Sequence, residues 1–193
     1  MKKNIIIIGS GGHALACIEI IENLNKYKIV GLIDNKLKIG TKVHNYKVIG
    51  SDKDLLKLFK FYKYALIGIG QIKSHKIRYN IFKKLKEIGY KLPTVVAKNA
   101  YISKRSIIGE GTIIMNNVLI NAGSEIGDNC IINNFSLVEH NCKVLNNCHI
   151  STSVTLNGDV KINENCFIGS KSVIKNGYEL KSNQIISMGS RVS

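Results

Sequence analysis

The chain has 193 residues, and 45% of them are apolar, which suffices for one ordinary domain or two small ones with real cores. Its formal net charge is +15, but the lysines are scattered and lack the interleaved aromatic residues or recognition motif of a nucleic-acid-binding protein. We therefore predict no nucleic-acid partner. The basic surface would instead attract small polyanions by electrostatic steering.

Neither the apolar segments nor the cysteines indicate a membrane, secreted or zinc protein. Glycines and His13 interrupt the N-terminal apolar run before a secretory segment would be complete, and no later run approaches the roughly 18 to 20 residues of a membrane span. The five cysteines include no CxxC pair. We predict a cytoplasmic protein without a membrane span and without a metal.

The first half of the chain predicts alternating strands and helices. Residues 3–9 form an apolar run typical of a buried strand, and an amphipathic segment at 14–24 predicts a helix. Between them lies a glycine-rich turn, Gly9-Ser10-Gly11-Gly12-His13. The remaining elements expected here are a strand over 28–34 that ends at Asp34, helices over about 51–60 and 75–88, and a strand over 64–70.

A glycine turn between a strand and a helix lets a phosphate approach unpaired backbone amides at the positive end of the helix. Asp34 follows at about the spacing of a ribose-binding acid. A dehydrogenase would need two βαβαβ halves to bind a dinucleotide. Only about 92 residues precede the repeats that make up the second half of the chain. The sequence therefore predicts a half-Rossmann module that binds one nucleotide. A tight turn without any ligand is the alternative interpretation.

An aliphatic residue recurs at every sixth position from Ile102 to Ile186 without interruption. This period fits neither a helix nor a simple alternating strand. It predicts a parallel β-helix with three flat faces, in which eighteen residues make one circuit and about five coils stack. The domains expected are therefore residues 1–92 and 93–193.

From Ser106 to Ser172, the position four places after each aliphatic residue is small or β-branched, as expected for a tight corner that packs inward. It includes Cys130, Cys142, Cys148 and Cys166, which we interpret as corner packing rather than as chemical groups. Cys17 lies in a predicted helix and receives the same interpretation.

Particular strings narrow the family: IIIIGSGGHA, GLID, GIGQIKSHKIR, SLVEHNC and ISTSVTLNGDVKI. Over nearly the whole chain they resemble the bacterial sialic acid O-acetyltransferase family, which includes N-acetyltransferases of nucleotide-linked deoxyamino sugars. The resemblance implies a left-handed β-helix that binds acetyl-CoA, an N-terminal domain that binds a sugar nucleotide, and a homotrimer with acetyl-CoA held between neighbouring chains.

The resemblance also assigns residues. His140 matches the catalytic base, and its phase agrees, because it lies at a turn two places after an inward aliphatic residue. Asn133 matches an active-site asparagine, and His149 matches the residue that meets the thioester of acetyl-CoA. The acetyl-CoA site is further expected to include Gly158 and Gly189, and the sugar-nucleotide site Gly9, Gly11, Gly12, His13 and Asp34.

Three of these assignments have structural alternatives. Gly158 stacks one circuit beyond His140, where bulk would block the cofactor arm, but it also fits an ordinary turn glycine. His13 could simply start the helix, and Asp34 could cap a turn.

Two departures from the family pattern are visible. Asn141 stands where the family usually has an acid after the catalytic histidine, and an amide cannot stabilise the imidazolium as a carboxylate does. The chain also lacks the GxPA tail that many relatives use against coenzyme A, which could weaken binding at the adenine end.

The sequence thus predicts acetyl transfer from acetyl-CoA to the amine of a nucleotide-linked deoxyamino sugar, in a pathway that makes a bacterial surface glycan. His140 would accept the proton without an acyl-enzyme or a metal. The alternatives are O-acetylation of a sialic or related nonulosonic acid, and a non-enzymatic sugar-nucleotide-binding protein.

Overall fold

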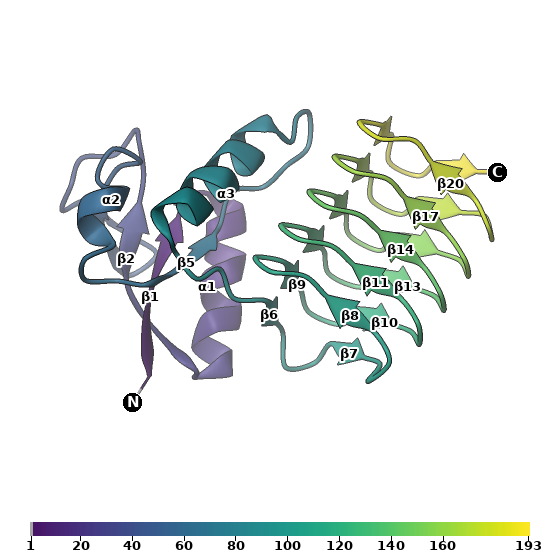
Figure 1. The fold of residues 1–193 in the computed structure, drawn as a ribbon, viewed down its shortest axis with the longest axis horizontal. Helices are drawn as coiled ribbons and strands as arrows, with labels where there is room; N and C mark the ends of the chain where they lie inside the picture. The colour runs from purple at the N-terminus through teal and green to yellow at the C-terminus, as the bar shows by residue number, and fades with distance from the viewer. Residues whose placement is uncertain (1) are drawn as a thin grey trace. The chain divides into compact units, whose positions relative to one another are not determined.

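The computed structural model describes residues 2–193, which fold as two compact units. The first unit comprises the chain up to Gly70 together with Lys76–Pro93, and the second comprises Gln71–His75 together with Thr94–Ser193. The short segment Gln71–His75 thus leaves the first unit and packs with the second. Figure 1 shows the elements of both units.

The first unit is a five-stranded sheet with helices on both faces. Its elements are β1 (Lys3–Ile8), α1 (Gly12–Leu24), β2 (Tyr27–Ile33), β3 (Lys42–Val43), β4 (Tyr46–Gly50), α2 (Leu55–Leu58), β5 (Tyr64–Ile67) and α3 (Lys76–Ile88). The strand order is β3-β4-β2-β1-β5, and all neighbours are parallel except the β3–β4 hairpin.

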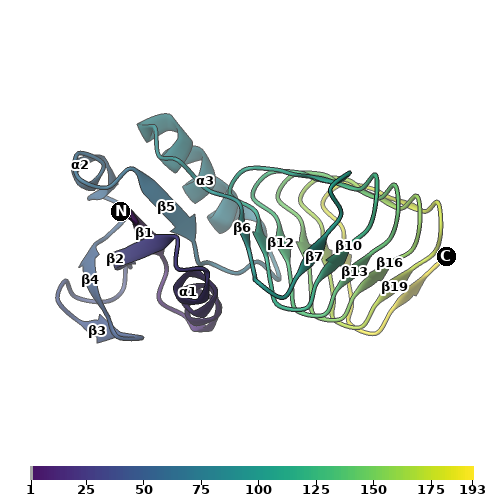
Figure 2. The same cartoon turned by 90° about the horizontal axis from the view of Figure 1, so that it is seen from below.

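The central strand β1 is buried on both faces, which explains its uninterrupted isoleucines. Ile6 and Ile8 pack in one cluster with Leu55 of α2 and with Ile81 of α3. Figure 2 shows α1 on one side of the sheet and α2 and α3 on the other. A parallel sheet covered on both faces selects continuous apolar strands rather than alternating ones.

The sequence elements predicted for this unit are present with two differences. The β3–β4 hairpin extends the sheet beyond β2, and the expected helix over 51–60 is reduced to the four residues of α2. Asp54 ends the preceding turn by accepting hydrogen bonds from the Ser51 backbone N–H at 2.8 Å and the Ser51 hydroxyl at 2.9 Å. These side-chain bonds favour a turn over an earlier helix start.

The second unit is a left-handed parallel β-helix of hexapeptide repeats, as the sequence predicts. It contains two-residue strands from β6 (Val95–Val96) to β22 (Arg191–Val192). The strands between them are β7 (Tyr101–Ile102), β8 (Ile107–Ile108), β9 (Ile113–Ile114), β10 (Leu119–Ile120), β11 (Glu125–Ile126), β12 (Ile131–Ile132), β13 (Leu137–Val138), β14 (Lys143–Val144), β15 (His149–Ile150), β16 (Thr155–Leu156), β17 (Lys161–Ile162), β18 (Phe167–Ile168), β19 (Val173–Ile174), β20 (Glu179–Leu180) and β21 (Ile185–Ile186).

Every third strand stacks on the same face, so Ile120 pairs with Val138 and Val138 with Leu156. The three sheets are β22-β19-β16-β13-β10-β7, β20-β17-β14-β11-β8 and β21-β18-β15-β12-β9-β6. Figure 1 shows the coils stacked as repeated turns. The second residue of each strand points inward, and these aliphatic side chains fill one continuous core.

From Gly111 onward, each turn contains a residue with a left-handed backbone, a requirement that the period-six pattern alone did not reveal. The residues with positive φ recur every six positions: Gly111, Asn117, Gly123, Asn129, Phe135, Asn141, Asn147, Ser153, Asp159, Asn165, Lys171, Gly177, Asn183 and Gly189. Glycine and asparagine predominate because they tolerate this conformation best.

The predicted inward corner residues are buried, and they also connect neighbouring coils. Ser124 donates its hydroxyl to the Glu139 carbonyl at 2.6 Å, and Cys130 donates its thiol to the Leu145 carbonyl at 3.1 Å. All five cysteines are buried and free of disulfides. Burial raises the pKa of the Cys142 thiol to about 11, which agrees with a packing role and disfavours a nucleophilic thiolate.

Among residues 2–193, no helix is both long enough and apolar enough to cross a membrane.

Candidate functional site

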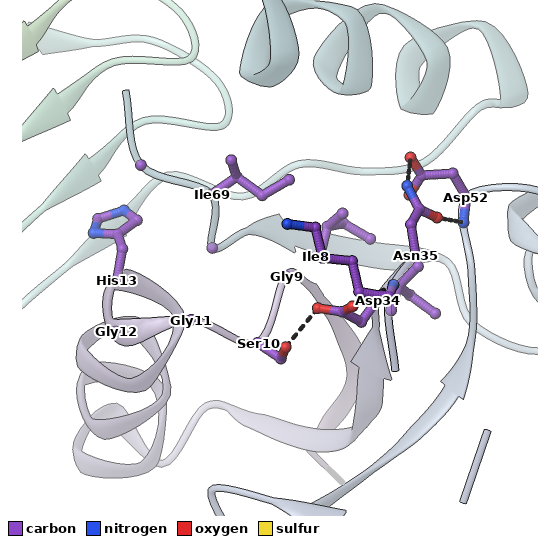
Figure 3. Close-up of a pocket in the computed structure, with 14 residues that line it drawn as sticks. Ile8, Gly9, Ser10, Gly11, Gly12, His13, Asp34, Asn35, Asp52 and Ile69 are labelled. Atoms are coloured by element: carbon purple, nitrogen blue, oxygen red, sulfur yellow. Dashed lines mark hydrogen bonds between the residues drawn. The ribbon is translucent and has the colours of Figure 1, made fainter. Parts of the chain in front are cut away.

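A cavity of about 520 Å³ lies in the first unit, where the carboxyl ends of β1, β2 and β5 meet the start of α1. Figure 3 shows its lining, which includes each residue that the sequence assigns to the sugar-nucleotide site. The lining residues are Ile8, Gly9, Ser10, Gly11, Gly12, His13, Ile33, Asp34, Asn35, Lys36, Asp52, Gly68, Ile69 and Gly70. The carboxyl edge of a parallel sheet is the usual place for a ligand in this fold class.

The glycine turn leaves open space at the start of α1. Gly9 has a φ of +103°, which favours glycine, whereas Gly11 has an ordinary φ of −80°. A methyl group added to Gly11 or Gly12 would meet no atom of the chain within 4 Å. No side chain caps the helix and no acid lies in its first turn, so its positive end faces the cavity.

Asp34 caps a turn at the edge of this cavity. Its Oδ2 accepts the Ser10 hydroxyl at 2.5 Å, and its Oδ1 accepts the backbone N–H groups of Lys36 at 2.7 Å and Leu37 at 3.1 Å. Burial opposes ionisation, but these hydrogen bonds outweigh it and hold the pKa of Asp34 below its ordinary value. The structure therefore supports the capping alternative, and a direct contact of Asp34 with a ligand stays a prediction.

Two side-chain contacts at the cavity were not expected from the sequence: one between two lining residues, Asn35 and Asp52, and one between the lining residue His13 and the buried Cys17 behind it. Asn35 donates to the Asp52 carboxylate at 2.7 Å and accepts the Asp52 backbone N–H at 3.0 Å, as Figure 3 shows. His13 places its Nε2 at 3.6 Å from the Cys17 thiol, whose pKa burial raises to about 12. Asp52 is distant from the glycine turn in sequence, and no local motif marks it.

His140 lies in the second unit, at the corner between β13 and β14, and its side chain is exposed. Its Nδ1 is 3.4 Å from the Nδ2 of Asn141, which also donates to the Asp159 carboxylate at 3.2 Å. Asp159 lies one circuit beyond Asn141. The carboxylate that is missing beside the histidine is thus present one coil further on, connected through the Asn141 amide.

Gly158 makes room for the His140 ring. A methyl group added to Gly158 would lie 2.5 Å from both the Cε1 and the Nε2 of His140, closer than real contacts allow. The lack of a side chain at position 158 therefore lets the imidazole extend over the next coil. A contact between Gly158 and a cofactor stays a prediction.

Asn133 and His149 lie together on another part of the β-helix, with the His149 Nε2 at 3.4 Å from the Asn133 Nδ2. His149 is 6% exposed, packs edge-on against Phe167 with ring centroids 5.2 Å apart, and places its Nδ1 at 2.5 Å from the Gln71 carbonyl. Asn133 and His149 flank the corner that leads from β12 and β15 into β13 and β16, whereas His140 follows β13.

Within one chain, the structure therefore joins Asn133 to His149 but leaves His140 at a different corner. Gly189 lies further away still, at a turn of the last coil, with a φ of +72°. Its assignment to the acetyl-CoA site also stays a prediction. Among residues 2–193, no cluster of three or more histidine, cysteine, aspartate or glutamate side chains could hold a metal ion.

Two family models match the chain in succession. The PglD N-terminal domain matches residues 4–85, and the bacterial transferase hexapeptide model of six repeats matches residues 105–140, 123–158 and 141–176. No curated protein sequence matches the chain.

Several solved structures resemble the chain over almost its full length. The acetyltransferase domain of PglB from Neisseria gonorrhoeae FA1090 is 25% identical with a TM-score of 0.92, covering 100% of this chain and 92% of that one. The same domain in complex with acetyl coenzyme A is 26% identical with a TM-score of 0.90, covering 100% and 93%. PerB from Caulobacter crescentus, in complex with CoA and GDP-perosamine, is 25% identical with a TM-score of 0.77, covering 95% and 91%.

The N-terminal domain, the repeats and these full-length likenesses agree with one another: the chain is an acetyl-CoA-dependent acetyltransferase that joins a PglD-type N-terminal domain to bacterial transferase hexapeptide repeats.

Proposed function

We propose that this protein transfers the acetyl group of acetyl-CoA to the amine of a nucleotide-linked deoxyamino sugar, in the synthesis of a bacterial surface glycan. Family membership makes it an acetyltransferase with acetyl-CoA as its co-substrate. The observation that carries the acceptor assignment is the cavity at the start of α1, since an acceptor without a nucleotide would have no use for it. The complex of PerB with GDP-perosamine supports the same acceptor class.

The diphosphate of the acceptor would lie against the glycine turn. Gly11 and Gly12 leave open space there, and the uncapped amides of α1 present a positive end. Asp52 and Asn35 form a polar edge on the same cavity, within reach of a base or a sugar hydroxyl. The first unit would therefore hold the acceptor, and the β-helix would hold acetyl-CoA.

His140 would act as the general base. The amine nitrogen attacks the thioester carbonyl, a C–N bond forms, the C–S bond breaks to release coenzyme A, and the nitrogen loses one proton to the imidazole. Hydrogen-bond donors around the carbonyl stabilise the developing oxyanion, and Asn133 is a candidate for one of them. The buried cysteines take no part, because a buried thiol with a raised pKa is a poor nucleophile.

For the Nε2 of His140 to accept this proton, the ring must carry its own proton on Nδ1. The Asn141 amide favours that tautomer only when its oxygen, rather than its Nδ2, faces Nδ1. In the structure the Asp159 carboxylate draws Nδ2 to the ring side. Catalysis would therefore include a rotation of the Asn141 amide.

A homotrimer would complete the site. The sheet formed by β7, β10, β13, β16, β19 and β22 lies between the His140 corner and the Asn133 corner. The outward side chains of its first five strands are uncharged and mostly apolar, namely Tyr101, Leu119, Leu137, Thr155 and Val173, and that of β22 is Arg191. Those of the sheet formed by β8, β11, β14, β17 and β20 are largely charged. Three prisms packed by the apolar sheet would place the His140 corner of one copy beside the Asn133 corner of its neighbour.

The test of the base assignment is His140→Ala, assayed by release of free coenzyme A. We expect kcat/KM to fall by about 10² to 10⁴, or roughly 2.7 to 5.4 kcal/mol of transition-state stabilisation. The coenzyme A affinity and the oligomeric mass serve as controls for folding. A folded variant with near wild-type turnover would exclude His140 as the base.

A further inference from the structure

Gln71 contacts His149 through its backbone, and its side chain contacts the residues that precede β15 and β18. It belongs to the segment that packs with the β-helix, and it is 3% exposed. Its side-chain Nε2 donates to the Asn147 carbonyl at 2.7 Å and approaches the Cys166 carbonyl at 3.5 Å. Its own backbone carbonyl lies 2.5 Å from the Nδ1 of His149.

The backbone contact determines where the imidazole carries its proton. A carbonyl oxygen only accepts hydrogen bonds, so Nδ1 must be the donor. In the neutral ring, Nε2 then keeps its lone pair, and the Asn133 Nδ2 at 3.4 Å is a donor placed to face it. The Gln71 carbonyl and the Asn133 amide thus favour the same tautomer of His149.

The side-chain contact holds that carbonyl in place. Two carbonyl oxygens from consecutive coils face the amide, so its Nε2 must point toward them and its Oε1 away. Gln71 Oε1 is buried without a hydrogen-bond partner, which is an unfavourable arrangement that an apolar side chain of similar length would avoid. The Nε2 amide, which donates to these two carbonyl oxygens, is therefore the part of the Gln71 side chain that this position requires.

We propose that Gln71 is a positioning residue that fixes His149 in the tautomer protonated at Nδ1, with its Nε2 lone pair directed toward the acetyl-CoA site. The proposal rests on the proposed function only for the role of His149 in acetyl transfer. With the ring held in this way, Nε2 accepts a hydrogen bond from the Asn133 amide or from an amide N–H in the pantetheine arm of bound acetyl-CoA. A ring with the opposite tautomer would present a donor at that point instead.

The experiment is ¹⁵N NMR of histidine-labelled full-length protein, in which a ring nitrogen with a proton and one with a lone pair have well-separated shifts. We expect wild-type His149 to show a protonated Nδ1 and an unprotonated Nε2 at neutral pH. Gln71→Met keeps the length but removes the donor, and Gln71→Glu places a carboxylate against two carbonyls. In both variants the His149 signals should move toward a mixture of tautomers while those of His140 stay unchanged.

The same variants should lower kcat/KM by about 3- to 10-fold, the effect of losing one hydrogen bond. Ile72→Ala, at an exposed position in the same segment, is the control and should change neither measurement. A wild-type His149 with its proton on Nε2, or an unchanged tautomer in Gln71→Met, would overturn the proposal. Because the NMR measurement needs no substrate, it decides this point even if the acetyl transfer proposed above is not found.

Discussion

At the scale of single residues, the chemistry around His140 depends on two neighbours one coil further along the β-helix. Gly158 leaves the space that the imidazole ring occupies, and Asp159 orients the Asn141 amide beside it. Neither residue is adjacent to His140 in the sequence. Both become neighbours because eighteen residues make one circuit.

Gly158→Ala tests whether Gly158 leaves room for the His140 ring or contacts coenzyme A. The added methyl would lie 2.5 Å from the His140 Nε2, so the ring must rotate away, while the ordinary φ of Gly158 allows the substitution in the backbone. We expect kcat to fall roughly 10- to 100-fold, because misplacing a catalytic group is costly, with coenzyme A affinity unchanged. Unchanged kcat with weakened coenzyme A binding would favour the cofactor contact instead.

Asn141→Asp restores the acid that relatives carry after the catalytic histidine. This variant alone does not isolate the effect of that acid on His140, because Asp159 lies beside position 141. The new carboxylate would lie beside Asp159, and two like charges at hydrogen-bond distance disfavour ionisation of one of them. The exchanged pair, Asn141→Asp with Asp159→Asn, avoids this repulsion.

In the exchanged pair a carboxylate stabilises the protonated, inactive ring, so the acidic limb of the kcat/KM profile should move to higher pH. The single variant should shift it less. An identical pH profile for wild type and the exchanged pair would show that this neighbour does not tune His140.

The sequence predicted the turn position of His140 and the burial of the corner cysteines, because both follow from the period of six. It did not reveal the contact of Gln71 with His149 or the place of Asp52 in the cavity lining. Gln71 reaches His149 across 78 positions of sequence, and such a contact has no periodic or local signal.

At the scale of elements, the junction of β1 and α1 combines a strained glycine with an open helix end. Gly9 requires its positive φ, whereas Gly11 does not and faces open space. Neither the backbone conformation nor the packing around Gly11 therefore requires a glycine at this position. We interpret it as making room for a ligand.

Gly11→Val should fold normally and lose sugar-nucleotide binding while it keeps coenzyme A binding. The valine side chain would project into the cavity where a phosphate would otherwise meet the amides of α1. Calorimetric titration of each ligand in turn measures the two affinities. Equal loss of both would count against the division of roles between the two units.

Strongly patterned elements were predictable from the sequence, and weakly patterned ones were not. The strands β1, β2 and β5, the helices α1 and α3, and the β-helix all follow from apolar patterns. The β3–β4 hairpin was missed because neither strand forms an apolar run and its turn residues His44 and Asn45 form no recognised turn motif.

At the scale of the whole molecule, His140 lies at a different corner from Asn133 and His149, and we predict that a neighbouring copy completes the proposed site. We predict a trimer with a mass about three times the 21.4 kDa of the chain, measured by light scattering. A mass of one chain in dilute solution would contradict this prediction.

Leu119→Asp tests which sheet forms the interface. It places a charge on the apolar sheet, where burial between copies would be costly, and it should shift the mass toward that of one chain. Lys161→Gln, on the charged sheet, is the control and should leave the trimer intact. A trimer that survives Leu119→Asp would place the interface elsewhere.

The central claim is that the acceptor is an amine on a nucleotide-linked sugar. The most direct test is coenzyme A release by the wild-type protein from acetyl-CoA, with matched acceptors: UDP-, GDP- and dTDP-linked deoxyamino sugars, their hydroxyl counterparts, free sialic acid and CMP-sialic acid. We predict rapid release with at least one nucleotide-linked amino sugar, an N-acetylated product by mass spectrometry, and little release with its hydroxyl counterpart. Release only with sialic acid or its CMP form would contradict it in favour of O-acetylation, and nucleotide binding without release from any acceptor would contradict it in favour of a binding protein.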